Sequence, residues 1–196
     1  MLAAIEIASK FYIMIGIYAG TFDPITNGHL WVIKEGIRLF KKGEFRVVVI
    51  RHRSKNCMFS LQDRMEMIRS VLSEHELDQH VKLDCIKGNE GLIGYVRQDA
   101  HRDCKRVDCD YFLLRGIRNA KDFKYEAAIA ERIRKRSQSS ISIIFVTPPE
   151  TVAGLSSTAV KEAVKTGSRE ELALSVSSHV LQRLLERDRA IGDKEQ

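Results

Sequence analysis

With 196 residues, the chain is long enough for one α/β domain with a sizeable core and short for two. Hydrophobic residues make up 44% and charged residues 30%, which excludes a disordered chain, and no apolar run is long enough to cross a bilayer. The net charge of +6 suits an anionic ligand, such as a nucleotide or a nucleic acid, but does not choose between them.

Residues 1–13 do not have the pattern of a secretory signal. Two charged residues interrupt the segment, and no basic region leads into an apolar core. Met14 stands directly before the first predicted strand. We therefore expect an N-terminal extension over residues 1–13 and one domain over residues 14–196, whose C-terminal helical region begins at about residue 168.

The cysteines indicate no zinc site. There are four of them, and they include no Cys-x-x-Cys pair: Cys57, Cys85, Cys104 and Cys109. A chain of this size needs no disulfide framework, so we interpret all four as reduced thiols.

The stretch that begins at Ile15 predicts a strand, a tight turn and the start of a helix. The strand ends at Gly20, where the missing side chain lets the backbone turn sharply or approach a ligand closely. The apolar residues of the following helix fall on one face: Leu30, Ile33, Ile37 and Phe40. A helix N-terminus gathers free N–H groups and attracts phosphate. Thr21 at the strand end and His29 in the first helical turn are therefore candidates for an anion site.

Further strands and helices alternate along the chain. The later predicted strands are residues 45–50, 81–86, 111–114 and 141–146. The later predicted helices start at Ser60 and then cover residues 92–101, 122–136, 156–164 and 168–189. Capping boxes are predicted for Ser60 with Asp63 and for Ser168 with Glu171. The densely charged residues 101–110 are interpreted as a solvated connection.

This alternation predicts an α/β fold, a single Rossmann-like domain with a five-stranded parallel sheet and helices on both faces. In such sheets the ligand lies beyond the carboxyl ends of the strands, at the point where the strand order reverses. Those ends offer Thr21, the loop with Lys55, the block from Arg115 to Arg118, and the loop before Ser156.

Two of these blocks suit phosphate groups. Arg115-Gly116-Ile117-Arg118 places two guanidinium groups beside a glycine, and each guanidinium can bind two oxygens. Leu155-Ser156-Ser157-Thr158 brings hydroxyls and free N–H groups to another helix start. Taken alone, the arginines could be surface charge and the serines an ordinary N-cap.

Taken together with the first turn, these blocks resemble a known family. Residues 20–29, Gly-Thr-Phe-Asp-Pro-Ile-Thr-Asn-Gly-His, resemble the nucleotidyltransferase signature, whose core pattern is Thr/His-x-Gly-His. The whole set is similar to bacterial phosphopantetheine adenylyltransferases from about Met14 to the last helix. Besides residues 20–29, the matching blocks are Ser54-Lys55, Arg115-Gly116-Ile117-Arg118, Asp122-Phe123-x-Tyr125-Glu126 and Ser156-Ser157-Thr158-x-Val160-Lys161-Glu162.

The resemblance implies an activity and its setting. A member of that family is a cytoplasmic enzyme of coenzyme A biosynthesis. It transfers the adenylyl group of ATP, bound with Mg²⁺, to 4′-phosphopantetheine, giving dephospho-CoA and pyrophosphate. The resemblance also implies a homohexamer, with neither nucleic acid nor a membrane as a partner.

The resemblance further implies a role for each matched residue. The catalytic residues would be His29, Thr21, Arg118 and Lys55. The ATP site would consist of Thr21, Phe22, His29, Gly116, Ile117, Arg118, Glu126, Leu155, Ser156, Ser157 and Thr158. The acceptor site would consist of Thr21, Lys55, Ile93 and Arg115. No residue would hold a metal by itself, because Mg²⁺ would arrive with ATP.

Two alternatives stay open at this point. A sister enzyme, such as nicotinate-mononucleotide adenylyltransferase or a cytidylyltransferase, shares the first motif, although the Arg-Gly-Ile-Arg block with Asp-Phe-x-Tyr-Glu argues against it. A nucleic-acid-binding module would use the positive charge and the basic run at residues 132–136. The chain has no aromatic-basic strand motif or recognition-helix pattern, and such a charge run is usually a solvated face.

Overall fold

The computed structural model describes residues 12–51, 56–86, 91–102, 108–137 and 141–192. The strands are β1 (Tyr12–Gly20), β2 (Glu44–Ile50), β3 (Lys82–Ile86), β4 (Asp108–Gly116) and β5 (Ile141–Val146). The helices, with one 3₁₀ turn, η1, are α1 (Asn27–Leu39), α2 (Leu61–Glu74), η1 (Asp78–His80), α3 (Gly91–Arg102), α4 (Ala120–Ser137), α5 (Glu150–Ala153), α6 (Ser157–Thr166), α7 (Arg169–Ser175) and α8 (Ser178–Gly192).

The strands form one parallel sheet in the order β3-β2-β1-β4-β5, which confirms the predicted α/β, Rossmann-like fold. β1 is central: Tyr18 pairs with Val47 of β2 on one side and with Leu114 of β4 on the other. The chain runs outward from β1 first to one edge and then to the other. The strand order therefore reverses between β1 and β4, where an open parallel sheet binds its ligand.

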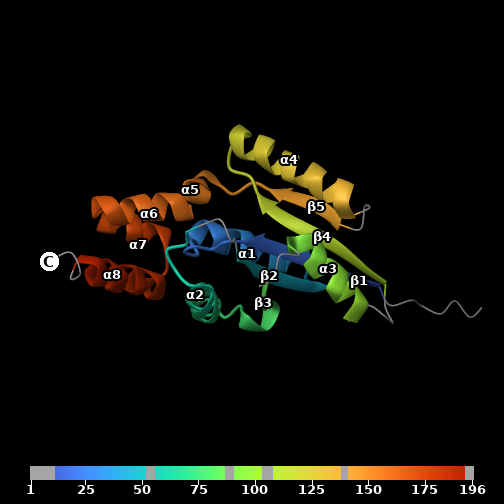
Figure 1. The fold of residues 1–196 in the computed structure, drawn as a ribbon, viewed down its shortest axis with the longest axis horizontal. Coiled ribbons are helices and arrows are strands. Elements are labelled where there is room, and N and C mark those ends of the chain that lie inside the picture. The colour runs from blue at the N-terminus through green and yellow to red at the C-terminus, as the bar shows by residue number, and fades with distance from the viewer. Residues whose placement is uncertain (1–11, 52–55, 87–90, 103–107, 138–140, 193–196) are drawn as a thin grey trace, which may run out of the picture.

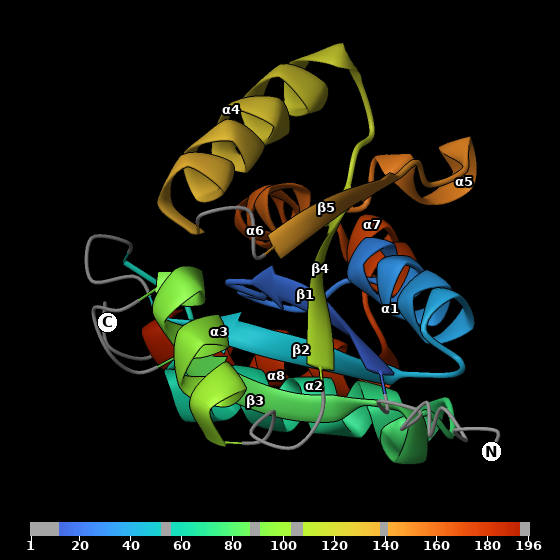
Figure 2. The same ribbon diagram turned by 90° about the vertical axis from the view of Figure 1, so that its right-hand side faces the viewer.

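Helices cover both faces of the sheet (Figure 2). Val47 and Val49 of β2 face a buried cluster that draws on α1, α2 and the C-terminal helices. Val48 faces the opposite way, into a cluster with Val96 of α3 and Ile133 of α4. Alternate side chains of β2 thus enter opposite cores, which explains the unbroken apolar run from Val47 to Ile50 in the C-terminal half of this strand.

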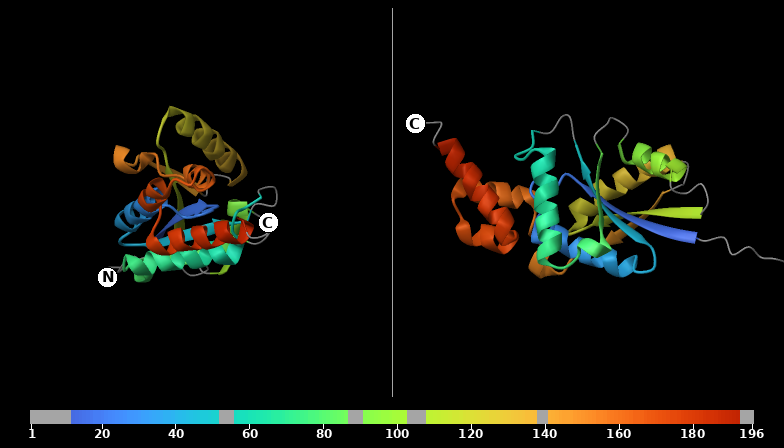
Figure 3. Two further views of the ribbon diagram at one scale, coloured as in Figure 1. Left: turned by 90° about the vertical axis from the view of Figure 1, so that its left-hand side faces the viewer. Right: turned by 90° about the horizontal axis from the view of Figure 1, so that it is seen from below.

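The C-terminal helices gather at one end of the molecule (Figure 1). α6 and α7 follow β5, and α8 lies alongside α2, where Arg183 forms an ion pair with Asp63 at 2.6 Å (Figure 3). This arrangement places α6 beyond the carboxyl end of the sheet. It therefore stands next to the turn that follows β1.

Several local predictions need correction. β1 starts at Tyr12 and not after Met14, because Tyr12 and Ile13 pair with Asp108 and Cys109 of β4. The same pairing extends β4 into the segment that was interpreted as a solvated connection. The second capping box is wrong, since the Ser168 side chain makes no cap hydrogen bond.

Two properties of the described residues bear on the bulk predictions. Cys57 and Cys85 are free thiols, as expected, but Cys109 is disulfide-bonded, which corrects the expectation of four reduced cysteines. Sequence spacing carried no signal for that bond, because a disulfide depends on how closely the fold brings two thiols together. Within the described ranges, no helix is long and apolar enough to cross a bilayer.

Candidate functional site

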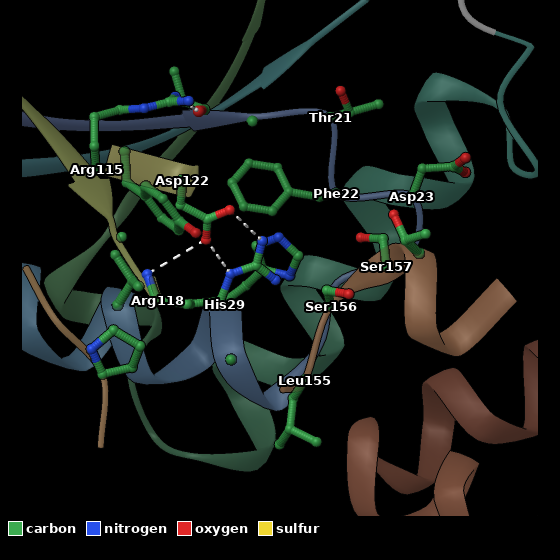
Figure 4. Close-up of a pocket in the computed structure, with 18 of the residues that line it drawn as sticks. Thr21, Phe22, Asp23, His29, Arg115, Arg118, Asp122, Leu155, Ser156 and Ser157 are labelled. Carbon is green, nitrogen blue, oxygen red and sulfur yellow. Dashed lines mark hydrogen bonds and ion pairs between the residues drawn. The ribbon is translucent and has the colours of Figure 1, made fainter. Parts of the chain in front are cut away.

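A pocket of about 630 Å³ lies at the carboxyl ends of β1 and β4, where the strand order reverses (Figure 4). Four segments line it: the β1–α1 turn, the end of β4 with the start of α4, the α5–α6 connection, and the residues before α2. Its polar lining residues include Thr21, Asp23, His29, Arg115, Arg118, Asp122, Glu126, Ser156, Ser157 and Lys161.

A reciprocal cap fixes the start of α1 at the pocket. The Thr26 hydroxyl accepts a hydrogen bond from the His29 main-chain N–H at 3.4 Å, and the Thr26 N–H donates to His29 Nδ1 at 3.1 Å. The Thr26 hydroxyl also donates to the Leu155 carbonyl at 3.2 Å, which joins this turn to the α5–α6 connection. A Cβ on Gly28 would lie 2.4 Å from that same carbonyl oxygen, so the close approach requires glycine.

The position of His29 determines its protonation state. Burial, with a further contribution from the charge on Arg118, lowers the pKa of His29 from its ordinary value of 6.5 to about 4. The ring is therefore neutral near pH 7. Because Nδ1 accepts from the Thr26 N–H, the ring hydrogen is on Nε2. The Phe22 ring packs against the His29 imidazole and holds its orientation; the centroids of the two rings are 5.1 Å apart.

A buried carboxylate connects three sides of the pocket. Asp23 is 3% exposed, and its two oxygens accept hydrogen bonds from the N–H groups of Met58 and Phe59 at 2.8 and 2.9 Å. Lys161 of α6 also forms an ion pair with Asp23. The residue between Thr21 and Asp23, Phe22, has a φ of 49°, a left-handed conformation that is rare for a bulky side chain. The turn after β1 is thus held in one conformation by buried contacts.

Both arginines of the Arg-Gly-Ile-Arg block are held by carboxylates of α4. Arg115 binds Glu126 through two hydrogen bonds of 2.6 and 2.7 Å and donates a third to the Ala19 carbonyl at 3.0 Å. Arg118 binds Asp122 at 2.7 Å, and in Figure 4 this pair lies beside His29. Two cationic forks therefore face the pocket, each with an anionic partner.

The N-terminus of α6 forms the opposite wall of the pocket. The Ser156 hydroxyl caps the helix by accepting from the Ala159 N–H, and the Ser157 hydroxyl donates to the Pro24 carbonyl at 2.8 Å. The first N–H groups of a helix have no intrahelical acceptor, so this wall carries donors and the positive end of the helix dipole.

The structure brings most of the predicted site residues together. The residues in the pocket lining are Thr21, Phe22, His29, Arg115, Gly116, Arg118, Glu126, Leu155, Ser156, Ser157 and Thr158. Ile117 does not line the pocket; it is buried, and its N–H donates to the Val146 carbonyl. Ile93 of α3 is not in the lining either and packs against the core cluster around Val48. Lys55 lies outside the described residues. The roles of all these residues stay predictions.

Sequence reasoning gave no role to several residues that line the pocket. Tyr18 lies two residues before the end of β1 and is buried. Its ring packs edge-on against the Phe22 ring, with the two ring centroids 5.3 Å apart. Asp23 and Lys161 both belong to blocks that match the family. Each is a charged residue in a segment of mostly apolar or hydroxyl-bearing residues, and that charge is the signal that could have identified them. Asp122, also in a matched block, gave no hint that it would hold Arg118.

Comparisons with known proteins agree on a family. The cytidylyltransferase-like family matches residues 17–163. The chain is similar to the phosphopantetheine adenylyltransferase of Chromobacterium violaceum, with 36% identity over 74% of this chain and 79% of that protein. The Geobacter metallireducens phosphopantetheine adenylyltransferase is 36% identical over 76% of this chain and 80% of that protein.

Solved structures of low identity share the fold. The nicotinic acid mononucleotide adenylyltransferase of Plasmodium falciparum, complexed with NaAD, has a TM-score of 0.68 at 14% identity and covers 89% of this chain and 95% of that chain. A bifunctional NMN adenylyltransferase/ADP ribose pyrophosphatase from Francisella tularensis has a TM-score of 0.58 at 16% identity, covering 79% of this chain and 43% of that chain. At these identities the likeness concerns the fold alone.

Proposed function

Since the chain belongs to the phosphopantetheine adenylyltransferase family, we propose that it transfers the adenylyl group of ATP to 4′-phosphopantetheine. An oxygen of the acceptor phosphate attacks the α-phosphorus, the bond from that phosphorus to the β-phosphate oxygen breaks, and pyrophosphate leaves. The products are dephospho-CoA and pyrophosphate. The attacking oxygen is already anionic at neutral pH, so the chain supplies positioning and charge stabilisation, and no general base is needed.

The observation that carries this proposal is the concentration of anion-binding groups around one pocket. The N-terminus of α6 and the first turn of α1 meet there, with the two forks of Arg115 and Arg118 on a third side. Two polyanionic substrates repel each other, and an arrangement of cations and N–H donors on several sides offsets that repulsion.

Each side of the pocket suits a different part of the reaction. The neutral His29 ring presents an Nε2–H that donates to the α-phosphate, where charge grows in the transition state. Arg118 and the α6 N-terminus with Ser156, Ser157 and Thr158 bind the phosphates of ATP. Arg115 and Lys55 bind the acceptor phosphate, and Thr21 lies between the two substrates. To bind Arg115, a phosphate must displace the carboxylate of Glu126, and to bind Arg118 it must displace that of Asp122.

Mg²⁺ enters with the nucleotide in this proposal. Among the described residues, no group of three side chains could hold a metal by itself. The pocket carboxylates of Asp23, Asp122 and Glu126 each pair with a basic residue. This lining fits Mg²⁺ held mainly by phosphate oxygens and water, the usual mode for nucleotide-bound magnesium. The ion would neutralise charge on the departing pyrophosphate.

Two wider properties come from the family alone and stand as proposals. We infer a homohexamer and a cytoplasmic location, as in phosphopantetheine adenylyltransferases. The molar mass in solution, measured by light scattering, tests the first: a monomeric active enzyme would contradict it.

A substrate panel tests the proposed function. The purified chain is incubated with ATP, Mg²⁺ and either 4′-phosphopantetheine or nicotinate mononucleotide, and pyrophosphate release is measured. We expect kcat/KM to favour 4′-phosphopantetheine strongly, since Arg115 and the Lys55 loop match the family blocks for that acceptor. Equal or better turnover of nicotinate mononucleotide would overturn the assignment in favour of the sister enzyme.

A further inference from the structure

A buried guanidinium next to the pocket has no carboxylate partner among the described residues. Arg64 belongs to the first turn of α2 and is only 2% exposed. Its Nη1 donates to the main-chain carbonyls of Thr21 and Ile50, at 2.5 and 3.3 Å. Its Nε is buried with no hydrogen-bond partner, and no carboxylate within the described ranges forms an ion pair with it. A buried cation at the positive end of a helix dipole is costly, so Arg64 is poorly placed for stability alone.

The two carbonyls that Arg64 binds mark the ends of neighbouring strands. β1 ends at Gly20 and β2 ends at Ile50, and Gly20 stands opposite Val49 in their ladder. The Thr21 and Ile50 carbonyls therefore lie where the hydrogen bonds between these strands stop. One planar guanidinium that binds both carbonyls holds the two strand ends at a fixed separation beyond the ladder.

Asp23 makes a second connection, between the turn after β1 and the residues before α2. Its carboxylate binds the N–H groups of Met58 and Phe59, just before α2 begins. The turn after β1 is thus fastened to the end of β2 by Arg64 and to the start of α2 by Asp23. The Thr21 main-chain carbonyl makes the first of these contacts, and Asp23, two residues later, makes the second.

We propose that Arg64 is a positioning residue for adenylyl transfer, which it serves by fixing the main chain at Thr21. The inference rests on the proposed function, because it assigns Arg64 to the residue that both substrates contact there. Arg64 itself does not line the pocket. In-line transfer depends on the separation of the reacting atoms, and a displacement of about 1 Å can cost about 10²-fold in rate.

The test compares Arg64→Met and Arg64→Lys with Arg69→Met, an exposed arginine on the same helix. For Arg64→Met we expect kcat to fall about 10²-fold while KM for ATP and for 4′-phosphopantetheine changes by less than about threefold. The ammonium of Arg64→Lys has enough donors for both carbonyls, but its shorter side chain does not extend to the position of Nη1, so its kcat should be intermediate. Arg69→Met should match the wild type. Each kcat is measured well below the melting temperature of that variant.

A double-mutant cycle with Thr21→Ala separates positioning from general damage. That substitution removes the Thr21 hydroxyl but keeps the carbonyl that Arg64 binds. If Arg64 acts through Thr21, adding Arg64→Lys to Thr21→Ala should lower kcat by much less than it does in the wild type. Independent, multiplicative losses would overturn the proposal, and this test holds even if Arg64→Met does not fold.

Two outcomes distinguish this inference from the proposed function. A folded Arg64→Met enzyme with wild-type kcat overturns the role of Arg64 and leaves the proposed function intact. A wild-type chain that releases no pyrophosphate with ATP and 4′-phosphopantetheine overturns the function on which the inference rests.

Discussion

Replacing His29 should damage catalysis much more than folding. In the structure, Nδ1 of this side chain completes the cap of α1, and in the proposed reaction its Nε2–H donates to the α-phosphate. Removing one preorganised donor to a developing charge typically lowers kcat by ~10²–10³. Loss of a helix cap typically costs about 1 kcal/mol, which lowers the melting temperature of a chain of this size by about 2–4 °C.

Two substitutions divide these tasks. His29→Ala removes both the cap and the donor, so we expect the full loss of kcat together with the small loss of stability. His29→Gln supplies a residue that also completes capping boxes, so it should restore the melting temperature without restoring kcat. His75→Ala, at an exposed histidine on the C-terminal side of α2, is the control and should match the wild type.

The assay is pyrophosphate release at saturating ATP and 4′-phosphopantetheine, with KM measured for each substrate. Because His29 is expected to act in the transition state, kcat should fall while both KM values stay near the wild type. A wild-type kcat in His29→Ala would refute the placement of the reaction beside this ring. A rise in KM for ATP with kcat unchanged would show instead that His29 contributes only to binding.

The same residue should make stability depend on pH in a defined window. The pKa of His29 is about 4 in the folded chain and 6.5 ordinarily, so between these values the unfolded chain binds a proton that the folded chain does not. Stability should therefore fall as the pH drops from about 6.5 towards 4, by at most about 3–4 kcal/mol from this residue. The half-buried ring also meets water, which makes that figure an upper bound. His29→Gln should flatten the dependence of melting temperature on pH in this window.

The remaining predictions concern the acceptor side and the start of the chain. Arg115→Ala should raise KM for 4′-phosphopantetheine and change ATP affinity little; it should also destabilise the fold, because Glu126 loses the partner of its half-buried carboxylate. If the variant mainly weakened ATP binding, Arg115 would belong to the nucleotide side. A chain that starts at Met14 should fold and keep its activity with a slightly lower melting temperature, since among the described residues it loses Tyr12 and Ile13 with their β1 pairings. Loss of activity or solubility would show that the fold requires residues before Met14.

Sequence reasoning predicted the fold where local signals and tertiary packing agree. The residues 141–146 were predicted as a strand and form β5, and the Ser60–Asp63 capping box begins α2 as expected. These segments carry an apolar pattern or a cap that needs no distant partner. The strand, turn and helix from β1 to α1 were predicted in the same way and are observed. The anion site expected at that turn stays a prediction.

Where distant contacts decide the structure, the sequence was insufficient. The helical region after residue 168 breaks at Val176, which is buried and extended, so that α8 can pack along α2. β4 begins at Asp108, within a charged segment, because β1 offers ladder partners there. Ile93 was expected near the acceptor by resemblance, but its helix turns it towards the core around Val48. None of these outcomes follows from local pattern.

The pairing of both arginines with α4 changes how substrate affinity should be understood. Arg115 makes all three of its contacts within the protein, so a phosphate that binds it gains only the difference between its own bonds and those to Glu126. A free guanidinium facing the pocket would bind the first phosphate more tightly but would repel its neighbour Arg118 in the empty site. The carboxylates of Glu126 and Asp122 balance the charges of the two arginines, and in the proposed reaction a polyanion would replace them. Only binding energy that is gained in the transition state accelerates the chemical step. In the proposed reaction, this exchange of partners would keep the ground-state binding of the substrates moderate.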